Sequence, residues 1–329
     1  MFKKEIYSLL LFSFGLLFTC CGESATDDEE KDNNGQGSVS VETNYLPIAD
    51  PYVMFYNNKY YAYGTGGTTA GEGFACFSSD DLKNWKREGQ ALSATDSYGT
   101  WGFWAPEVYY VESKKKFYLF YSAEEHICVA TSTTPEGPFR QEVKQPIWSE
   151  KSIDSSLFID DDGTPYLYFV RFTDGNVIWV AQMTDDLMSI KTETLNQCIK
   201  AEVSWELLQG KVAEGPSVLK KKGMYYLIYS ANHYQNKGYG VGYATSKSPM
   251  GPWTKYDKNP LLQGDESTGL VGTGCTLLAG GKQVLSEDID KAALERGIPG
   301  RTVRDAKREL GDALKSKIVE GRKKVFWME

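Results

Sequence analysis

Acidic side chains begin several similar stretches of this chain. Asp50 opens DPYVMFY, Asp154 opens DSSLFID and Glu214 opens EGPSVLK, and each stretch continues as an apolar run. Two carboxyl groups at one site can share acid–base chemistry, because one stays ionised and activates water while the other holds a proton for a leaving oxygen. A third negative charge nearby disfavours ionisation of the proton-carrying acid and raises its pKa. Three such acids, gathered by the fold, would suit the hydrolysis of glycosidic bonds.

The stretches that carry these acids are copies of one repeat with a period of about 50 to 60 residues. The copies span residues 50–85, 104–139, 154–189 and 214–253. Each has an apolar strand, a turn (NNK, ESKKK, DDDGT or KKKG), an aromatic strand and a third strand. The clearest copy is Lys211 to Ala231, where a Gly-containing turn between two strand patterns predicts a β-hairpin. We expect each repeat to form one blade of antiparallel strands.

Repeated blades of this kind predict an all-β propeller. The chain has 329 residues, 41% hydrophobic and 13% aromatic with 32 glycines, which suits one large domain with many tight turns. A blade cannot bury both of its faces alone, so the units are expected to stack around an axis. The first strand of a blade is innermost, and the acids that begin these strands, including Glu107 in WAPEV, would then converge on one end of the channel. We expect DDDGT, with Asp160 to Asp162, to be a structural turn rather than a metal cluster.

The pattern changes near the C-terminus. Residues 270–285, LVGTGCTLLAGGKQVL, begin a fifth blade that stays incomplete. Beyond Ser286, an N-cap residue with acids in the following turn indicates a helix. Apolar residues then follow at helical spacing: Val303, Ala306, Leu310, Leu314 and Ile318. The fold class predicted is a five-bladed β-propeller over 44–281 with an incomplete fifth blade, followed by a short α-helical tail over 282–329.

The first 43 residues predict the cellular location of the protein. Lys3 and Lys4 precede an apolar core, Ile6 to Phe18, that is too short to span a membrane. The following LFTCC resembles the lipobox of a bacterial lipoprotein signal over residues 1–20, with Cys20 or Cys21 as the lipidated residue. The acidic stretch over 21–43 is expected to be a flexible tether. We therefore expect an outer-membrane or cell-surface lipoprotein that touches the membrane through its lipid only, or alternatively a periplasmic or secreted protein.

Charge and cysteine usage exclude other classes of partner. The net charge of -8 argues against binding to nucleic acid, which needs a basic face, and suits a neutral substrate. The four other cysteines have no paired short spacing and no nearby His that would suggest a metal site, so no metal site is expected. They are Cys76, Cys128, Cys198 and Cys275. Cys76 and Cys128 lie in apolar strand patterns and are interpreted as small buried side chains.

The motifs together resemble glycoside hydrolase family 43, whose members are five-bladed β-propellers. The resemblance covers about residues 46–274 and rests on ADPYV with Asp50, WAPEV with Glu107, SIDSSLFIDDDGTPYLYFVR with Asp154 and Arg171, and EGPSV with Glu214. It implies that Asp50 is the general base, Glu214 the general acid, and Asp154 the residue that orients the acid and tunes its pKa. It also implies inversion at the anomeric carbon, for which two carboxyls stand about 6.5–9.5 Å apart.

The resemblance also indicates substrate-binding residues. Arg171 matches the family's active-site arginine, although a surface arginine on a strand is an alternative interpretation. Trp101 lies just before the second repeat and Trp104 is its first residue, and these aromatic side chains either stack on a sugar or anchor a loop. Glu107 is expected to line the funnel rather than to catalyse.

The substrate and the C-terminus leave alternatives. The family acts on α-L-arabinofuranosides, β-D-xylosides and some galactans, and we expect an exo-acting, monomeric α-L-arabinofuranosidase or β-xylosidase on plant cell-wall polysaccharides. No organic cofactor is implied, and Cys275 stands where the family has a histidine, which leaves a structural Ca²⁺ unsupported. A non-catalytic surface glycan-binding lipoprotein and a truncated inactive hydrolase are the alternatives. Fructan-cleaving propellers are disfavoured, because their Asn-Asp-Pro-Asn motif is replaced here by Ala-Asp-Pro-Tyr.

Overall fold

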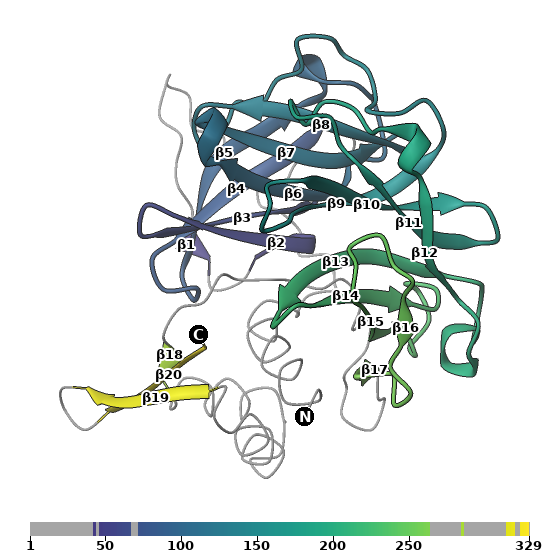
Figure 1. Ribbon diagram of the computed structural model, residues 1–329. Coiled ribbons are helices and arrows are strands. Elements are labelled where there is room, and N and C mark those ends of the chain that lie inside the picture. Colours follow the sequence, from purple (N-terminus) through teal and green to yellow (C-terminus); the bar gives the residue numbers. More distant parts are fainter. Residues whose placement is uncertain are drawn as a thin grey trace, which may run out of the picture. The chain divides into compact units, whose positions relative to one another are not determined.

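The computed structural model describes residues 42–43, 46–66, 72–263, 284–285, 314–319 and 323–328. These residues form an all-β, propeller-like fold in which helix is limited to single 3-10 turns (Figure 1). Four antiparallel sheets correspond to the four repeats found in the sequence. The prediction of antiparallel blades is therefore confirmed for four units, whereas the fifth blade expected over 270–285 lies almost entirely outside the described residues.

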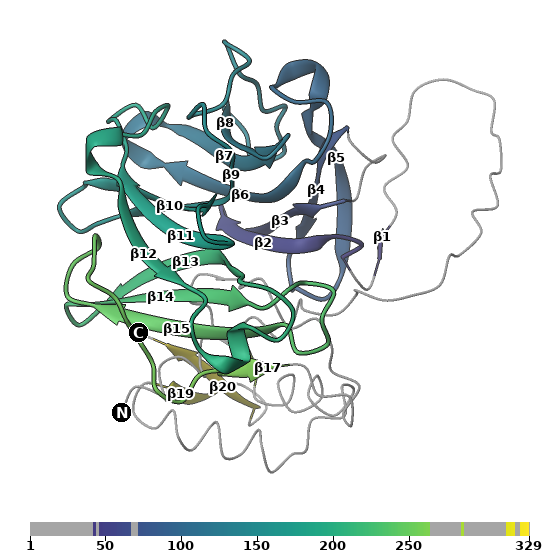
Figure 2. The same ribbon diagram turned by 90° about the vertical axis from the view of Figure 1, so that its right-hand side faces the viewer.

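In each of these sheets, strands that follow one another in the chain pair as antiparallel neighbours, except that β1 pairs with β5 and β17 with β15. The first contains β1 (Glu42–Thr43), β5 (Trp85–Ser93), β4 (Gly73–Ser79), β3 (Lys59–Thr65) and β2 (Ala49–Tyr56). The second contains β6 (Trp104–Val111), β7 (Lys116–Ala123) and β8 (His126–Ser132). The third contains β12 (Asn196–Lys200), β11 (Asn176–Gln182), β10 (Pro165–Phe172) and β9 (Ser152–Ile159). The fourth contains β13 (Ala213–Lys221), β14 (Met224–Ala231), β15 (Gly240–Ser246) and β16 (Thr254–Lys255), with β17 (Leu262–Gln263) also on β15 (Figure 2). The 3-10 turns are η1 (Ala94–Asp96), η2 (Glu112–Lys114), η3 (Thr192–Thr194) and η4 (Ser204–Glu206).

The described residues divide into two compact units. The N-terminal unit comprises the described residues of Phe18–Tyr52 and Tyr56–Ser155. The C-terminal unit comprises Val53–Phe55 and the described residues of Ser156–Glu329. The predicted site residues are shared between these units.

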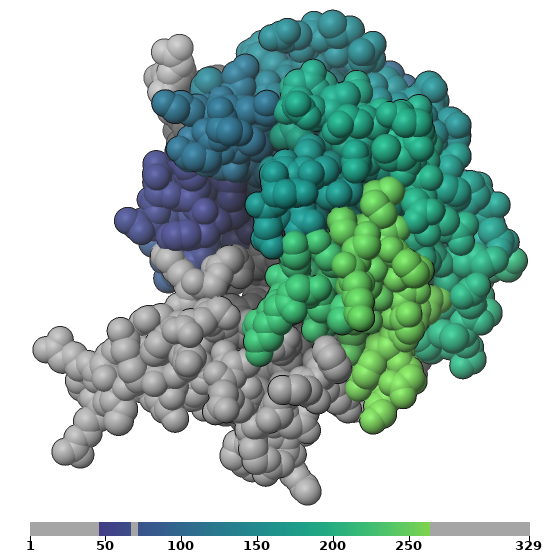
Figure 3. All heavy atoms as spheres, in the orientation of Figure 1, coloured from purple at the N-terminus to yellow at the C-terminus, as the bar shows by residue number. Residues whose placement is uncertain are grey.

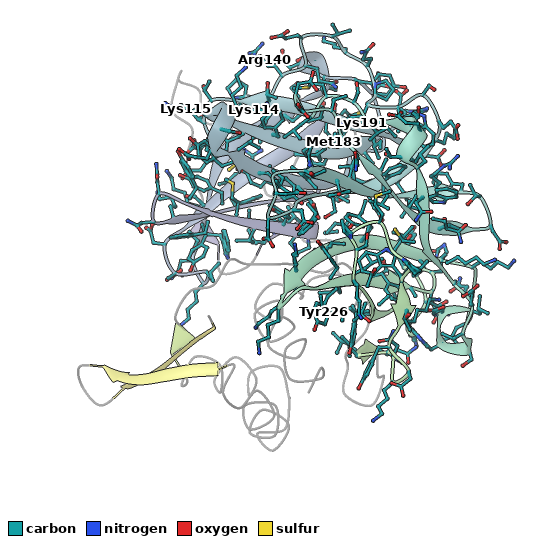
Figure 4. All side chains as sticks on the ribbon, in the orientation of Figure 1. Lys114, Lys115, Arg140, Met183, Lys191 and Tyr226 are labelled. Atoms are coloured by element: carbon teal, nitrogen blue, oxygen red, sulfur yellow. The ribbon has the colours of Figure 1, made fainter. Side chains whose placement is uncertain are left out.

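The turns within the blades have the backbone that their sequences predict. Asn57 and Asn58 join β2 to β3 with φ of 47° and 62°, and Lys222 and Gly223 join β13 to β14 with φ of 50° and 75°. Left-handed residues in pairs are typical of two-residue hairpins, whose twist matches that of the strands. Lys115, left-handed at 50°, closes the longer β6–β7 connection and is labelled with Lys114 in Figure 4.

The second strand of each blade supplies the core, because both faces of these strands are covered. Tyr63, Tyr121, Tyr168 and Tyr229 are fully buried. Figure 3 shows the atoms that form one outer face of the molecule, coloured by residue number. Two of these tyrosines have their hydroxyls satisfied by backbone carbonyls, Tyr63 on Pro135 at 2.5 Å and Tyr168 on Pro249 at 2.6 Å. Cys76 and Cys128 are also fully buried, as expected.

The C-terminal tail differs from the sequence prediction. Leu314–Val319 and Lys323–Met328 form the strands β19 and β20, and β20 also pairs with β18 (Val284–Leu285). Leu314 and Ile318 are therefore in a strand and not in a helix. Their spacing of four fits an alternating pattern as well as a helical one, and the β-branched and aromatic residues around them favour the strand. Val303, Ala306 and Leu310 lie outside the described residues.

The N-terminal predictions lie outside the described residues as well, including the signal, Cys20, Cys21 and most of the tether. Within the described ranges, no helix has the length and apolarity needed to cross a membrane. The same ranges hold no group of His, Cys, Asp and Glu side chains that could bind a metal ion.

Candidate active site

One left-handed residue recurs near the start of the first strand in every blade. It is Asp50 in β2, Ala105 in β6, Asp154 in β9 and Gly215 in β13, with φ of 46°, 44°, 55° and 55°. A left-handed backbone costs about 1–2 kcal/mol for a residue with a Cβ. Strain of this kind is concentrated at functional sites. Asp50 and Asp154 thus occupy equivalent positions in their blades.

Glu214 is offset from this position by one residue, which corrects the expectation that the three acids are equivalent. It precedes the left-handed Gly215, as Trp104 precedes Ala105. The pairing of β13 with β14 shifts between Glu214 and Ser217, and that of β6 with β7 shifts between Trp104 and Glu107. The extra residue of such a β-bulge re-aims the side chains beside it, which a repeat alignment made by sequence alone does not register.

Hydroxyl side chains hold the left-handed residues in the N-terminal unit. Thr65 Oγ1, at the end of β3, donates to Asp50 Oδ2 at 2.6 Å and accepts from the N–H of Ala105 at 2.9 Å. Ser122 Oγ, at the same place in β7, accepts from the N–H of Asp154 at 3.0 Å. In both cases the hydroxyl binds the left-handed residue of the following blade. Thr65 and Ser122 were not among the residues predicted from the sequence. The signal that could have identified them is their shared position, the seventh residue of the strand.

The seventh residue of the second strand is Thr65 in the first blade and Ser122 in the second. In the third blade this position, in β10, is occupied by Arg171, and in the fourth, in β14, by Ser230. The guanidinium carbon of Arg171 lies 4.4 Å from the centre of the Trp179 ring. This cation–π contact, which is favourable for a guanidinium over an indole face, orients the side chain. A large cation at a position that otherwise carries a small hydroxyl favours a role in binding over that of an ordinary surface arginine.

The predicted aromatic residues and Glu107 belong to the N-terminal unit. The rings of Trp101 and Trp104 are 6.1 Å apart and nearly perpendicular, and Trp101 is 50% exposed. Glu107 Oε2 accepts a hydrogen bond from the hydroxyl of Tyr109. Burial and the negative charge of Glu107 raise the pKa of Tyr52 far above its usual range, so this phenol stays neutral. Glu107 thus interacts with two tyrosines, and its expected role in lining the funnel stays a prediction.

In the C-terminal unit, both oxygens of Glu214 are bound by neutral donors. Asn176 Nδ2 donates to Oε2 at 2.8 Å, and the hydroxyl of Tyr239 donates to Oε1 at 2.7 Å. Neither residue was predicted from the sequence, because Asn176 is at the start of β11 and Tyr239 is the residue before β15. An amide and a hydroxyl are neutral donors, and each fixes the position of one carboxyl oxygen.

The turn before β11 presents Asn176 to Glu214. Asn176 donates its N–H to the carbonyl of Lys211 at 2.9 Å, and Lys211 Nζ pairs with Asp174 at 2.7 Å. Gly175, at φ 76°, is so close that a Cβ would lie 2.0 Å from the same carbonyl. Only glycine fits this approach, so the turn docks tightly on the residues that lead into β13.

The predicted site residues are thus divided between the units. Asp50, Asp154, Glu107, Trp101 and Trp104 belong to the N-terminal unit, and Glu214 and Arg171 to the C-terminal unit. The predicted turn at DDDGT is confirmed by the bonds from Asp160 N to Thr164 O and from Gly163 N to Asp160 O, at 3.0 and 2.9 Å. The catalytic roles of the three acids stay predictions.

Comparison with known proteins identifies the family. A model of the glycosyl hydrolases family 43 matches residues 46–278. The chain belongs to this family. It is 31% identical over 243 residues to a β-D-galactofuranosidase of Aspergillus niger, covering 67% of each chain. An arabinoxylan arabinofuranohydrolase of Bacillus subtilis is 28% identical over 263 residues, and the match covers 64% of this chain and half of that enzyme. A solved structure of an endo-1,4-β-xylanase from Bacteroides thetaiotaomicron is 90% identical, with a TM-score of 0.69, and covers 75% of this chain and 83% of that one.

This family-43 chain is therefore a glycosidase with an all-β fold. The repeat, the left-handed acids and the matched range all lie between residues 46 and 278.

Proposed function

We propose that this family-43 glycosidase removes α-L-arabinofuranosyl groups from xylan-type polysaccharides. The observation that carries the proposal is the pair of furanosidases among the relatives, a β-D-galactofuranosidase and an arabinoxylan arabinofuranohydrolase. A β-D-galactofuranosyl ring has the configuration of an α-L-arabinofuranosyl ring and differs by one further hydroxymethyl group. A pocket that accepts this ring configuration would account for both names.

The proposed mechanism is a single displacement with inversion. Asp50 takes a proton from a water molecule, whose oxygen bonds to the anomeric carbon as the glycosidic C–O bond breaks. Glu214 gives its proton to the leaving oxygen and becomes a carboxylate, which later regains a proton from solvent. Thr65 on Asp50, and Asn176 with Tyr239 on Glu214, support these assignments because each fixes a carboxyl oxygen. Asp154 would orient the acid, and Arg171 would bind sugar hydroxyls.

A second candidate is cleavage of β-D-xylosyl linkages. It is favoured by the 90% identity to a structure described as an endo-1,4-β-xylanase. Xylan carries both linkages, with xylosyl units in its backbone and arabinofuranosyl units on its branches. One surface could therefore bind the polymer for either reaction, and the choice depends on the ring that the pocket admits.

The deciding experiment is hydrolysis of three 4-nitrophenyl glycosides by the purified chain: α-L-arabinofuranoside, β-D-galactofuranoside and β-D-xyloside. We expect the arabinofuranoside to be cleaved fastest, the galactofuranoside more slowly, and neither by Glu214→Gln. Proton NMR of the first-formed sugar should show the β-anomer. Release of xylose alone would replace the first candidate by the second. Binding of arabinoxylan without hydrolysis of any substrate would favour a glycan-binding protein.

We also propose that the chain is a surface lipoprotein. The proposal rests on LFTCC at residues 17–21 after an apolar core and before an acidic stretch. In Triton X-114 phase partitioning, we expect wild type in the detergent phase. Of the variants Cys20→Ser and Cys21→Ser, the one that removes the lipidated cysteine should leave the detergent phase. If the double variant still partitions into detergent, the anchor is not a lipid on these residues.

A further inference from the structure

The loop that carries Trp101 is held by the turn between β7 and β8. Glu124 and Glu125 make this turn, and both are left-handed, with φ of 52° and 57°. Glu124 Oε1 accepts hydrogen bonds from the backbone N–H and the hydroxyl of Thr100, both at 2.9 Å. The N–H of Glu124 donates to the carbonyl of Trp101 at 3.1 Å. Three hydrogen bonds to one residue therefore fix the backbone on which the Trp101 ring stands.

Two glycines let the loop approach this turn closely. Gly99 has a φ of 98°, and a Cβ there would lie 2.6 Å from the Cβ of Ala123. Gly102 has a φ of 67°, and a Cβ there would lie 3.3 Å from the ring of Trp104 and 3.5 Å from the Glu124 nitrogen. Both positions are left-handed and crowded, which only glycine tolerates without strain. The loop is thus shaped to fit Glu124 and Trp104.

The same turn also holds the strand of Asp154. Ser122 Oγ, two residues before Glu124, accepts from the Asp154 N–H at 3.0 Å, and the carbonyl of Glu125 accepts from Ser152 at 2.8 Å. Trp104 lies directly opposite Ser122 in the pairing of β6 with β7. Residues 122–125 therefore contact both the loop of Trp101 and the strand of Asp154, all within the N-terminal unit.

The charge of Glu124 suits this task. The hydrogen bonds from the Thr100 N–H and hydroxyl, in that order, lower the pKa of Glu124 below its usual range. The side chain is thus a carboxylate at neutral pH, and hydrogen bonds to charged acceptors are stronger than those to neutral ones. The ends of the loop have other anchors: Tyr98 N–H donates to Gln141 Oε1 at 2.7 Å, and the Phe103 ring stacks on Tyr121 at 6.0 Å.

We propose that Glu124 is a positioning residue that fixes Trp101 as a sugar-stacking surface at a set distance from Asp154. The proposal rests on the proposed function, since it assigns Trp101 to substrate binding. The exposed Trp101 ring, buttressed edge-on by Trp104, offers the apolar face that stacks on a sugar. Without the Glu124 carboxylate, Thr100 to Gly102 would sample other conformations. Each binding event would then include the entropic cost of ordering this loop, which weakens binding.

The experiment is a double-mutant cycle on Glu124 and Trp101. In hydrolysis of 4-nitrophenyl α-L-arabinofuranoside, Glu124→Ala should raise KM about tenfold, as expected for a lost charge-assisted contact, and change kcat less than about threefold. Glu124→Gln should recover most of the affinity, because its amide oxygen still accepts from Thr100. In a Trp101→Ala background, Glu124→Ala should add no further change. Additive effects, or a fall in kcat at unchanged KM, would overturn the proposal.

A second readout separates this proposal from the proposed function. Tryptophan fluorescence of Glu214→Gln and of Glu214→Gln/Glu124→Ala is titrated with arabinoxylan-derived oligosaccharides, which needs no turnover. Tighter binding by the first protein supports the role of Glu124 even if no glycoside is cleaved, and equal binding overturns it. Glu112→Ala is the matched control, since Glu112 is an exposed acid beside Lys114 and Lys115 at the other end of the β6–β7 hairpin (Figure 4). It should match wild type in KM and thermal midpoint.

Discussion

Asp160 and Glu214 are two carboxylates of the C-terminal unit, and the donors that bind each of them differ in one respect. Asp160 accepts from Lys220 Nζ at 2.6 Å and from the hydroxyl of Tyr225 at 2.5 Å. Glu214 accepts from an amide, Asn176, and from the hydroxyl of Tyr239. One of these donors is a tyrosine hydroxyl for both acids. The second is the ammonium group of Lys220 for Asp160 and the amide group of Asn176 for Glu214.

Asp160 lies in the β9–β10 turn, but its partners Lys220 and Tyr225 and the acid Glu214 lie at opposite ends of one hairpin, β13–β14. Lys220 and Tyr225 face each other next to the β13–β14 turn, whereas Glu214 pairs with Ser230 at the far end. Six residues of strand separate Lys220 from Glu214, about 20 Å at the usual rise. A cation holds a carboxylate ionised and so stabilises a fold, whereas an acid that must give and regain a proton needs partners that tolerate both states. If the proposed function is right, the turn end of the hairpin serves stability and the Glu214 end serves chemistry.

The strongest way to break this comparison is to remove each charge in turn. Glu214→Gln should lower kcat/KM for 4-nitrophenyl α-L-arabinofuranoside by about 10²–10⁴-fold, the usual contribution of a general acid, and leave the thermal midpoint nearly unchanged. Asp160→Asn should keep kcat/KM within about threefold of wild type, because this acid holds a turn and binds Lys220 and Tyr225 at the end of the hairpin away from Glu214. Comparable losses of activity in the two variants would remove the distinction.

The leaving group distinguishes the roles of the acids. A 2,4-dinitrophenolate leaves without protonation, so the loss in Glu214→Gln should shrink on a 2,4-dinitrophenyl glycoside. The loss in Asp50→Asn should not, since attack by water is needed for every leaving group. If the dependence is reversed, the assignments of acid and base are exchanged.

Local pattern was enough to predict much of this fold. The four repeats, their antiparallel strands and the turns at Asn57–Asn58 and Lys222–Gly223 follow from alternation, aromatic runs and turn residues that act over a few positions. In the tail, the spacing of Leu314 and Ile318 fits a helical period and a strand period equally well. These residues form a strand because they pair with β20. A spacing of four alone could not have shown which partner was available.

The site itself depended on contacts that a sequence pattern does not contain. Thr65 reaches Ala105 across 40 residues, and Asn176 reaches Glu214 across 38. The register shift beside Glu214 and the left-handed conformation of Gly215 are backbone features that the acidic residue type alone does not reveal. The acids could be found from chemistry and repetition, but the groups that hold them could be found only from three-dimensional structure.

Stability should respond at the turn end of the hairpin. Asp160→Asn weakens the hydrogen bond from Lys220 and leaves that ammonium, 22% exposed, with Asp161 as its remaining carboxylate. We expect a loss of about 1.5–3 kcal/mol in the free energy of unfolding, as for hydrogen bonds to charged groups. Urea denaturation at pH 7 measures it. Asp161→Asn is the control, because its carboxylate is 83% exposed, and its loss should be under about 1 kcal/mol.

The contribution of Asp160 should depend on pH in one direction. Burial raises its pKa, but the hydrogen bonds from Lys220 and Tyr225 outweigh burial and leave the pKa below its usual value. The unfolded chain, with a pKa of about 3.9, therefore binds a proton before the folded chain does, and stability rises with pH in this window. The difference in unfolding free energy between wild type and Asp160→Asn should be constant above about pH 5 and shrink as pH falls through the folded pKa. A difference that grows on acidification would contradict the assignment.

The finest test uses the two tyrosines, which make the same kind of bond to the two acids. Tyr239→Phe removes the donor to Glu214 Oε1 and should lower kcat/KM about three- to tenfold, the equivalent of about 1 kcal/mol for one hydrogen bond, with little change in urea midpoint. Tyr225→Phe removes the donor to Asp160 Oδ2 and should lower the free energy of unfolding by a similar amount at unchanged kcat/KM. Steady-state kinetics and urea denaturation on both variants give four values. If Tyr225→Phe lost activity or Tyr239→Phe lost only stability, the division of the hairpin into a stabilising and a chemical end would be wrong.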